Sequence, residues 1–510
     1  MKFKSFSLLL FLSCGFFACS LEETLNEDLN KKDAEEFLNA NTDVSALLTG
    51  CYDGMKEPFQ DQARLWAAQQ HTSDETLGPT RGGDWDDNGI WRVLHNHTWT
   101  ADHDFLKQTF NQLLQLVFAT TNLQSFNATV AQKAEARFLR AFVMYTVADG
   151  WNQVPFRNPG ENLLNAPQVL KGAEAIDFVI SELTAVIPDL PDGPVNRANK
   201  NAAKGLLMRA YLNKGTFADR SNPTFPAGDM DKVIALADEI SAGGQYSLED
   251  NYFDNFAPNN DQVSSENIWT YENVAGTGRG SGNSVRSRWF CTLHYNQNPS
   301  GWNGFATLSD FYDSFEASDL RKKADYPGMT EVGGINAGFL IGQQVDQNGL
   351  ELNDRKGNKL AFTREVALNE AGNNLEITGI RVIKYPIDYG SGDNVNNDYV
   401  FLRYADVVLM KAEALLRKNL AGDALPIVNN LRAKRGASTL SELTADILLA
   451  ERGREFYWEG NRRTDMIRFG KFLAPFQEKS AVSGPERLLF PIPAAALAVN
   501  PNLEQNPGYR

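Results

Sequence analysis

Residues 451–468 read ERGREFYWEGNRRTDMIR. Glu451, Glu455 and Glu459 recur every four residues, so a helix places the three carboxylates on one face. Arginines alternate with them, and the aromatic triplet at 456–458 is typical of a core. Clustered charges are more often paired than catalytic, so the pattern indicates a charge network that fixes the last long helix to the fold. The alternative is a glycosidase, which needs two carboxylates flanking a sugar.

Helical periodicity dominates the first half of the chain and its tail. In 128–149, for example, Ala134, Phe138 and Tyr145 share one face. Ala405 and Ala412 give 401–418 a small-residue face that a neighbouring helix can approach closely. We therefore predict a mostly α fold, with a tetratricopeptide-like superhelical scaffold of irregular helix pairs. The predicted helices are 33–56, 104–125, 128–149, 170–187, 200–214, 229–241, 401–418, 423–434 and 443–459.

Two long segments, 57–100 and 250–400, lack this periodicity and are rich in Gly, Asn, Asp and Trp. Connections longer than about 15 residues are usually functional or disordered, and the aromatic content here favours an ordered, functional face. Minor β-structure is expected within it. Asn348-Gly349 is a strong hairpin-turn signal, and 376–385 is a candidate strand.

Further motifs follow one another along the chain. They read GWNQVP at 150–155, NAAKGLLMRAYL at 201–212, RYADVVLMKAEA at 403–414, NLRAKRGA at 430–437, LFPIP at 489–493 and NPNLEQNPGY at 500–509. Together with 451–468 they resemble the SusD/RagB family of surface lipoproteins, although Asn152 replaces the family's usual glycine. The resemblance implies a protein that captures glycans and hands them to a SusC-like TonB-dependent transporter of the outer membrane.

The N-terminus has the pattern of an export signal. Lys2 and Lys4 precede an apolar run that ends at Ala18, and Cys19 follows. This run is shorter than the about 20 residues of a membrane span. Cys19 resembles the cysteine of a lipobox, which would carry the lipid anchor, and the acidic segment 21–28 resembles the export signals of lipoproteins that face the cell exterior.

The predicted organisation is a signal peptide over 1–18 and a single mature domain over 19–510. Its helical scaffold lies mainly in 33–56, 104–245 and 401–475, and its ligand-face loops lie mainly in 57–103 and 250–400. The predicted location is the outer membrane, lipid-anchored and facing the exterior.

Composition narrows the class of partner. The 510 residues carry a formal net charge of −15, and removing the two leader lysines makes the chain more acidic. An acidic surface repels phosphate backbones, so nucleic acid is excluded as a partner. It also favours a neutral glycan, such as a glucan, over a polyanion.

Tryptophans gather in the two loop segments. A flat indole can cover the C–H face of a sugar ring, and flanking Asn, Asp and Arg side chains can bond its hydroxyls. Any single tryptophan is more often a packing residue, but flanking glycines and charges place several on surface loops. The predicted ligand-binding residues are Asp74, Arg81, Trp85, Asn88, Trp91, Trp289, Tyr295 and Trp302.

No metal or cofactor is required by the pattern. Asp84, Asp86 and Asn88 match the first half of an EF-hand loop, but its twelfth position is His95 rather than glutamate. A looser calcium site on these three residues stays open. His95, His97 and His103 lie close in sequence without a further ligand to complete a zinc site. Cys51 and Cys291 either pair or are separate buried thiols.

Three functions are consistent with these features. The first is non-catalytic capture of oligosaccharide or polysaccharide. The second is peptide binding, as in the RagB-like branch of the family. The third is a secreted glycosidase, against which the absence of an evident catalytic pair argues. Aromatic-rich loops favour the first.

Overall fold

The structure, a computed structural model, describes residues 39–82 and 84–509. The signal peptide predicted for 1–18, the lipid site predicted at Cys19 and the acidic segment 21–28 lie outside the described residues. Residues 44–510 cluster into one compact unit. None of the helices within the described ranges has both the length and the apolar content that a membrane span requires.

Helices are the main regular element of this unit, as predicted. The longer ones are α2 (Val44–Asp53), α6 (Asp104–Leu123), α7 (Val130–Trp151), α8 (Gly172–Val186), α9 (Lys200–Ala218), α10 (Ala227–Ala242), α15 (Tyr404–Arg417), α16 (Ala421–Lys434) and α17 (Ala445–Phe456). The shorter ones are α3 (Lys56–Gln60), α4 (Leu65–Gln70), α5 (Ile90–His95), α11 (Asn260–Val263), α12 (Ser287–Phe290), α13 (Ser309–Asp313), α14 (Thr330–Gly333), α18 (Arg462–Arg468) and α19 (Ala494–Val499).

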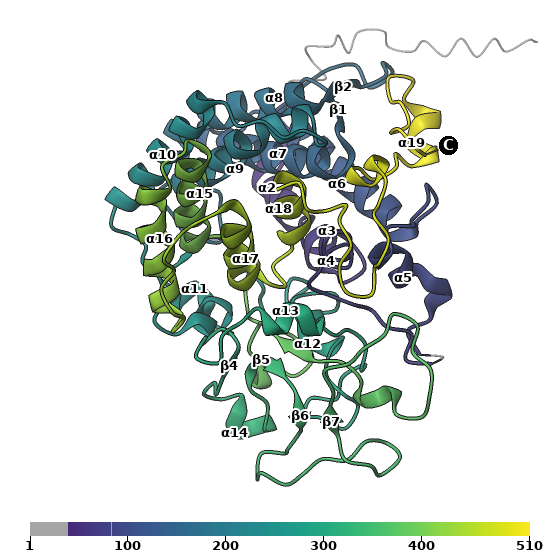
Figure 1. Cartoon of the computed structure of the whole chain (residues 1–510). Helices are drawn as coiled ribbons and strands as arrows, with labels where there is room; N and C mark the ends of the chain where they lie inside the picture. The colour runs from purple at the N-terminus through teal and green to yellow at the C-terminus, as the bar shows by residue number, and fades with distance from the viewer. Residues whose placement is uncertain (1–38, 83, 510) are drawn as a thin grey trace, which may run out of the picture. The chain divides into compact units, whose positions relative to one another are not determined.

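Successive helices pack in pairs. α6 packs on α7, α7 on α8, α8 on α9 and α9 on α10, after which α10 contacts α15 and α15 contacts α16. Figure 1 shows this series as a curved array of helices. The helix-pair scaffold predicted from the periodicity is confirmed.

Local sequence explains where these helices begin and how closely they pack. Thr129 forms a capping box with Gln132 at the start of α7, and Asn199 accepts from the Ala202 N–H at the start of α9. Ala405 and Ala412 are fully buried on α15, as the small-residue pattern predicted.

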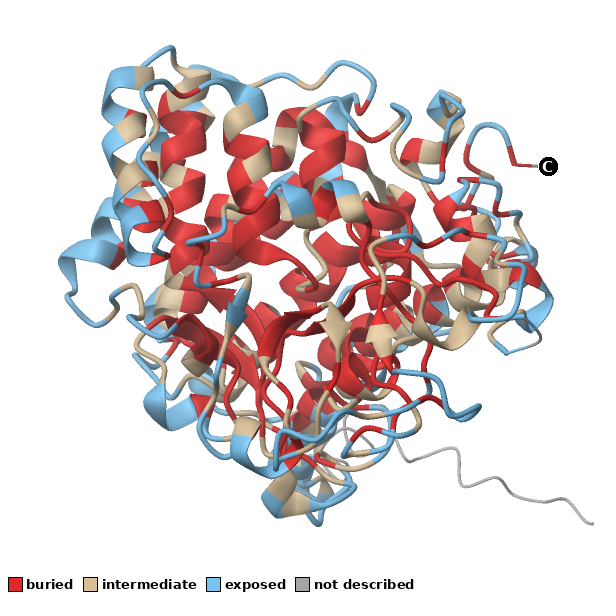
Figure 2. Cartoon of the chain, turned by 60° about the horizontal axis from the view of Figure 1, so that its bottom comes forward, coloured by how far each residue is buried: buried red, intermediate tan, exposed pale blue. Residues whose placement is uncertain are grey.

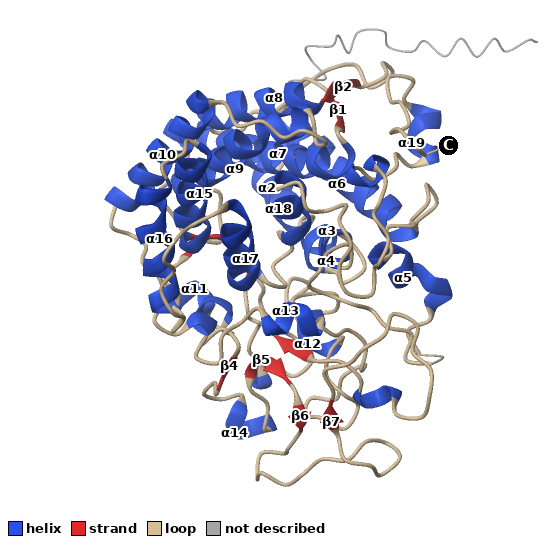
Figure 3. Cartoon of the chain, in the orientation of Figure 1, coloured by secondary structure: helices blue, strands red, loops and turns tan. Residues whose placement is uncertain are grey.

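Strands are short and few (Figure 3). They are β1 (Gln153–Phe156), β2 (Gln168–Lys171), β3 (Asn267–Tyr271), β4 (Lys323–Ala324), β5 (Ala337–Leu340), β6 (Gly342–Gln343), β7 (Ala361–Phe362), β8 (Arg381–Ile383) and β9 (Tyr399–Arg403). The pairs are β1–β2, β3–β9, β4–β5, β5–β8 and β6–β7, all antiparallel.

Two predicted helices have wrong boundaries. Of the helix predicted over 33–56, residues 42 and 43 are not helical and α2 spans only Val44–Asp53. The segment 401–418 begins as a strand, because Tyr399–Arg403 pairs with β3 before α15 starts at Tyr404. Two β predictions are confirmed: Gly349 takes a positive φ in a tight turn closed by the Val345–Glu351 bridge, and β8 lies within 376–385.

The loop-rich half is ordered by packing. Buried residues run through the helices and on into this half of the molecule (Figure 2). Cys51 and Cys291 are free, buried thiols, so the alternative of separate buried thiols is the one observed. Burial raises the pKa of Cys51 to about 11, as expected for an unreactive thiol.

Candidate binding surface

Two of the predicted tryptophans meet at the surface of the loop-rich half. The Trp302 side chain is 46% exposed, and that of Trp85 is half-buried. The indole Nε1–H of Trp85 donates to the carbonyl oxygen of Trp302 at 2.8 Å, and the ring centroids are 6.5 Å apart. The hydrogen bond therefore fixes one ring beside the other.

The segment from Phe290 to Gly304 folds back on itself and brings a third ring alongside. The Trp302 N–H donates to the Phe290 carbonyl at 2.7 Å, and the Phe290 ring lies 5.7 Å from that of Trp302. Gly304 completes the arrangement. A Cβ atom there would come within 2.4 Å of the Trp85 ring, so only glycine lets the indole lie against the backbone.

Tyr295 is joined to the segment that carries Trp85 through Asp84. Its hydroxyl donates to the Asp84 carboxylate at 2.9 Å, and the Arg355 guanidinium lies 3.9 Å from the centre of its ring. We call Trp85, Phe290, Tyr295 and Trp302 the aromatic platform. Side chains at its edge, such as Arg355 and Asp84, carry hydrogen-bonding groups next to the rings.

The backbone around the platform is strained. Trp85 has a φ of +61°, and Asn88 and Asn303 each have a φ of +53°. Such angles are uncommon for residues with a Cβ atom, most of all for a bulky one. Each costs on the order of 1–3 kcal/mol, and such strain collects at functional sites. The conformation that exposes these rings is thus held against a local energetic cost.

Two other predicted tryptophans lie in the core instead. The Trp91 side chain is 4% exposed, and its Nε1–H donates to Asp87. The Trp289 side chain is 2% exposed. Neither ring has a face available to a ligand in this conformation, so we leave both out of the platform.

The remaining predicted residues have other surroundings. The Arg81 guanidinium is buried and donates to the carbonyl oxygens of Gly304 and Leu375. These hydrogen bonds fix the backbone on which the Trp85 ring lies. Asp74 accepts two hydrogen bonds from Arg462, at 2.7 and 2.8 Å. Asn88 is exposed. Sequence reasoning missed Phe290 and Arg355. The former had one usable signal: it directly follows Trp289, and neighbouring residues on a helix point in different directions.

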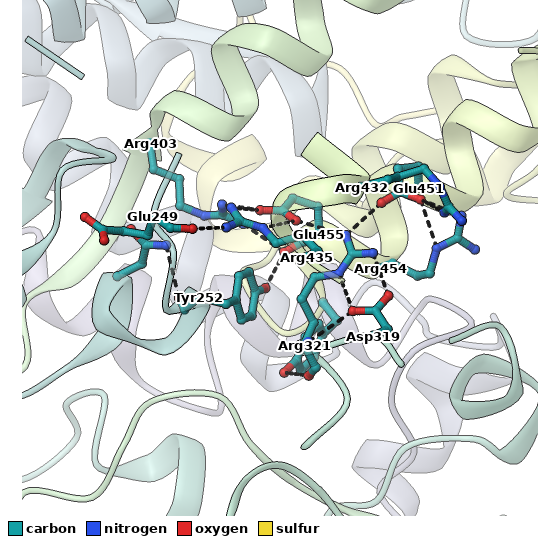
Figure 4. Close-up of polar contacts among 12 residues, drawn as sticks. Glu249, Tyr252, Asp319, Arg321, Arg403, Arg432, Arg435, Glu451, Arg454 and Glu455 are labelled. Carbon is teal, nitrogen blue, oxygen red and sulfur yellow. Dashed lines mark hydrogen bonds and ion pairs between the residues drawn. The ribbon is translucent and has the colours of Figure 1, made fainter. Parts of the chain in front are cut away.

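The carboxylates of 451–468 form the predicted charge network (Figure 4). Glu451 pairs with Arg321 at 2.7 Å and with Arg432 at 2.6 Å. Glu455 pairs with Arg403 at 2.6 Å and with Arg435 at 2.9 Å. Both glutamates are fully buried. With every carboxylate oxygen engaged, neither residue is available to act on a sugar.

Electrostatics holds these carboxylates ionised. Burial alone would raise the pKa of Glu451, but the charges of Arg321, Arg454 and Arg432 outweigh it and hold the pKa at about 2. For Glu455 the guanidinium groups of Arg435 and Arg403 likewise overcome burial, and its pKa lies well below the usual range. A general acid needs the opposite, a raised pKa.

The histidines and the EF-hand-like segment were the candidate metal ligands. No group of three or more His, Cys, Asp or Glu side chains in the described part of the chain could hold an ion. His95 and His97 bond the carbonyl oxygens of Gln477 and Thr72. His103 bonds the carbonyl oxygen of Ile90.

The three predicted calcium ligands point to separate partners. Asp84 accepts from Tyr295, Asp86 pairs with Arg92 at 2.6 Å, and Asn88 lies on the exposed turn between them and α5. A calcium cage needs six to eight converging oxygens, and these residues do not fit it.

Comparison with known proteins agrees with this architecture. A family model described as the SusD family matches residues 236–484. The starch-binding protein SusD of Bacteroides thetaiotaomicron is 26% identical over 423 residues, which cover 75% of this chain and 73% of that protein. These matches support a SusD/RagB-family protein.

Solved structures of SusD-like proteins share the fold. A SusD superfamily protein from Parabacteroides distasonis superposes with a TM-score of 0.71 at 17% identity, covering 94% of this chain and all of that one. A laminarin-binding SusD-like protein gives a TM-score of 0.67 at 20% identity, covering 91% of this chain and 99% of that one. The helix-pair scaffold with a loop-rich face is thus the architecture of these SusD-like proteins.

Proposed function

We propose that the protein is a non-catalytic glycan-binding protein whose aromatic platform captures neutral oligosaccharide or polysaccharide. The observation that carries the proposal is the pair of Trp85 and Trp302, of which one ring is exposed and the other is fixed beside it by a hydrogen bond. Neighbouring aromatic rings at the surface form an apolar patch, and contiguous apolar patches mark binding sites.

The chemistry of the platform suits carbohydrate. The rings of Trp85, Phe290 and Trp302 are tilted relative to one another, by 46° and 69° for the neighbouring pairs, so they line a curved rather than a flat surface. Sugar rings can stack on these faces while Asp84 and Arg355 bond hydroxyl groups at the edge. Few contacts to a well-solvated ligand leave modest affinity.

The named relatives favour the same ligand class. One is a starch-binding protein and another binds laminarin, and both names refer to neutral glucose polymers. We propose a glucan for this chain on that ground and because its net charge of −15 opposes polyanions.

We further propose that the mature protein is anchored through lipid on Cys19 to the outer membrane, facing the exterior. There it would deliver glycan to a SusC-like TonB-dependent transporter. The proposed lipid anchor rests on the lipobox pattern of the N-terminus, and the proposed delivery to a transporter rests on the family resemblance.

A binding screen tests the proposal. The purified mature protein is run by affinity electrophoresis through gels that contain neutral or charged polysaccharides, and the retained ones are measured by calorimetry. Trp302→Ala should weaken binding at least about tenfold, or about 1.4 kcal/mol, because it removes the most exposed ring.

The matched control is Leu164→Ala, which removes a side chain that is 92% exposed on the β1–β2 loop. It should bind polysaccharide like the unaltered protein. If no polysaccharide binds, or Trp302→Ala binds as tightly as the unaltered protein, the proposal fails. Retention of peptides alone would point to the RagB-like alternative.

A further inference from the structure

The helical scaffold contains a cavity that the aromatic platform does not touch. Its volume is about 100 Å³. Most of its lining comes from α7, α9, α18, β9 and the turn at 459–461, and α3, α4, α15 and α17 contribute the rest. None of the four platform residues lines it. A single water needs only about 10–15 Å³ of such space, so the cavity can hold something considerably larger.

Several polar groups that line the cavity have no protein partner. The Asn461 side chain makes no hydrogen bond with any described residue, although it is half-buried. Arg209 uses Nε for Asp406 and Nη2 for the Phe401 carbonyl, both at 2.9 Å, which leaves Nη1 unused among the described contacts.

Deeper groups are also incompletely satisfied. Arg452 lines the cavity, is 4% exposed, and has a buried Nη1 without an acceptor in the described structure. Asp149 accepts from Gln69 and Thr464 through Oδ2, so its Oδ1 is unused by the described residues. Of these groups only Arg452 Nη1 is a buried atom without a partner in the described structure. Buried polar groups are nearly always satisfied, so together with the unused atoms of Asn461, Arg209 and Asp149 it favours a polar occupant.

Part of the lining is aromatic. Phe142, Tyr145, Tyr399 and Phe401 contribute to the wall and each is between 5% and 8% exposed. The Tyr145 hydroxyl accepts from Asn213 at 3.0 Å and has its own proton free to donate. Apolar ring faces with a few convergent donors and acceptors are the features of a small-molecule site.

We propose that this cavity binds a single neutral sugar ring. A pyranose has vicinal hydroxyls, and each can donate and accept a hydrogen bond. Such a ring can therefore bond the amide of Asn461, the guanidinium of Arg209 and the free carboxylate oxygen of Asp149. A charged ligand is less suited, because Arg209 and Arg452 are already neutralised by Asp406, and Arg452 also by Asp465. The site is independent of the platform and of the function proposed for it.

The test uses the full mature protein and a panel of D-glucose, D-galactose, D-mannose and D-xylose. Binding is measured by saturation-transfer NMR and by calorimetry. At least one sugar should bind with a stoichiometry of one and a dissociation constant on the order of 1 mM. Asn461→Leu, which breaks no hydrogen bond of the described structure, should lower that affinity at least tenfold and leave polysaccharide retention unchanged.

Two further variants separate the possible results. Tyr145→Phe removes one donor and should weaken the same sugar severalfold, whereas Trp302→Ala should leave it unchanged. The proposal is overturned if no sugar of the panel binds, or if Asn461→Leu and Tyr145→Phe, folded by circular dichroism, bind it normally. Loss of monosaccharide binding in Trp302→Ala would also overturn it, because the binding would then belong to the platform. So would a crystal soaked with the sugar that holds only water in the cavity.

Discussion

Gly304 determines where the Trp85 ring can lie. The indole rests on the backbone of Gly304, and an added Cβ atom would stand 2.4 Å from ring carbons and 2.9 Å from the Cys291 carbonyl oxygen. Since Gly304 has no positive φ, alanine can adopt its backbone conformation. A substitution there must displace the Trp85 ring and also shift the backbone next to Cys291.

Gly304→Ala should therefore reduce polysaccharide affinity severalfold while the protein stays folded, because Trp85 loses its position beside Trp302. Calorimetric titration with the polysaccharide that binds the unaltered protein measures the effect. Gly228→Ala is the control, since a Cβ atom there meets nothing within 4 Å. Equal affinity of Gly304→Ala and the unaltered protein would show that the position of the Trp85 ring does not matter.

Exposure of individual tryptophans could not be predicted from the sequence. Trp85 and Trp91 share one polar segment, yet Trp91 packs on His71 and Phe305, and its ring is covered. Its neighbours in space come from other parts of the chain, so the local sequence does not predict them. The prediction that several of the tryptophans lie on surface loops needed only the flanking glycines and charges.

At the scale of the element, α17 is held by charge rather than by apolar packing alone. Removing one partner from a buried ion pair leaves the other charge unpaired and costs about 3–5 kcal/mol. Glu455→Gln should thus lower the free energy of unfolding by about 3 kcal/mol, because Arg403 and Arg435 lose one of the two carboxylates that they share, the other being Glu266.

Urea denaturation followed by tryptophan fluorescence measures the change. Glu504→Gln breaks the exposed pair with Lys171 and should have no measurable effect. If the two substitutions cost the same, the network does not hold α17 in place.

The elements also show what periodicity can and cannot establish. α6 to α10 were predicted to within a few residues, because long amphipathic stretches have an unambiguous period. The strand at Tyr399–Arg403 was missed, because a short apolar run fits a buried strand and a helix equally well. Only its pairing with β3, more than 100 residues earlier, distinguishes the two.

For the whole molecule, buried histidines make stability depend on pH. Burial lowers the pKa of His71 to about 3, of His97 to about 3 and of His95 to about 4. In the unfolded chain these groups titrate near 6.5, so below that pH the unfolded state binds more protons and stability falls. The carboxylates Glu451 and Glu455 add a second loss as pH falls below about 4.5 towards their own pKa values.

His71→Phe should reduce the loss of stability that the buried histidines cause as the pH falls below about 6.5. Both ring nitrogens of His71 are buried without a partner among the described residues, and its ring packs against Trp66 and Phe305. A phenyl ring removes the unsatisfied groups and cannot charge. The free energy of unfolding, measured in urea at pH 7 and pH 5, should fall less between these values in the variant; an unchanged difference would exclude His71 as a source.

A crystal structure with an oligosaccharide from the best-binding polysaccharide would test directly whether glycan binds across Trp85 and Trp302. We expect sugar rings stacked on Trp302 and Trp85, with hydroxyls in reach of Asp84 or Arg355. Well-ordered sugar at another surface, with the platform bare, would contradict this expectation.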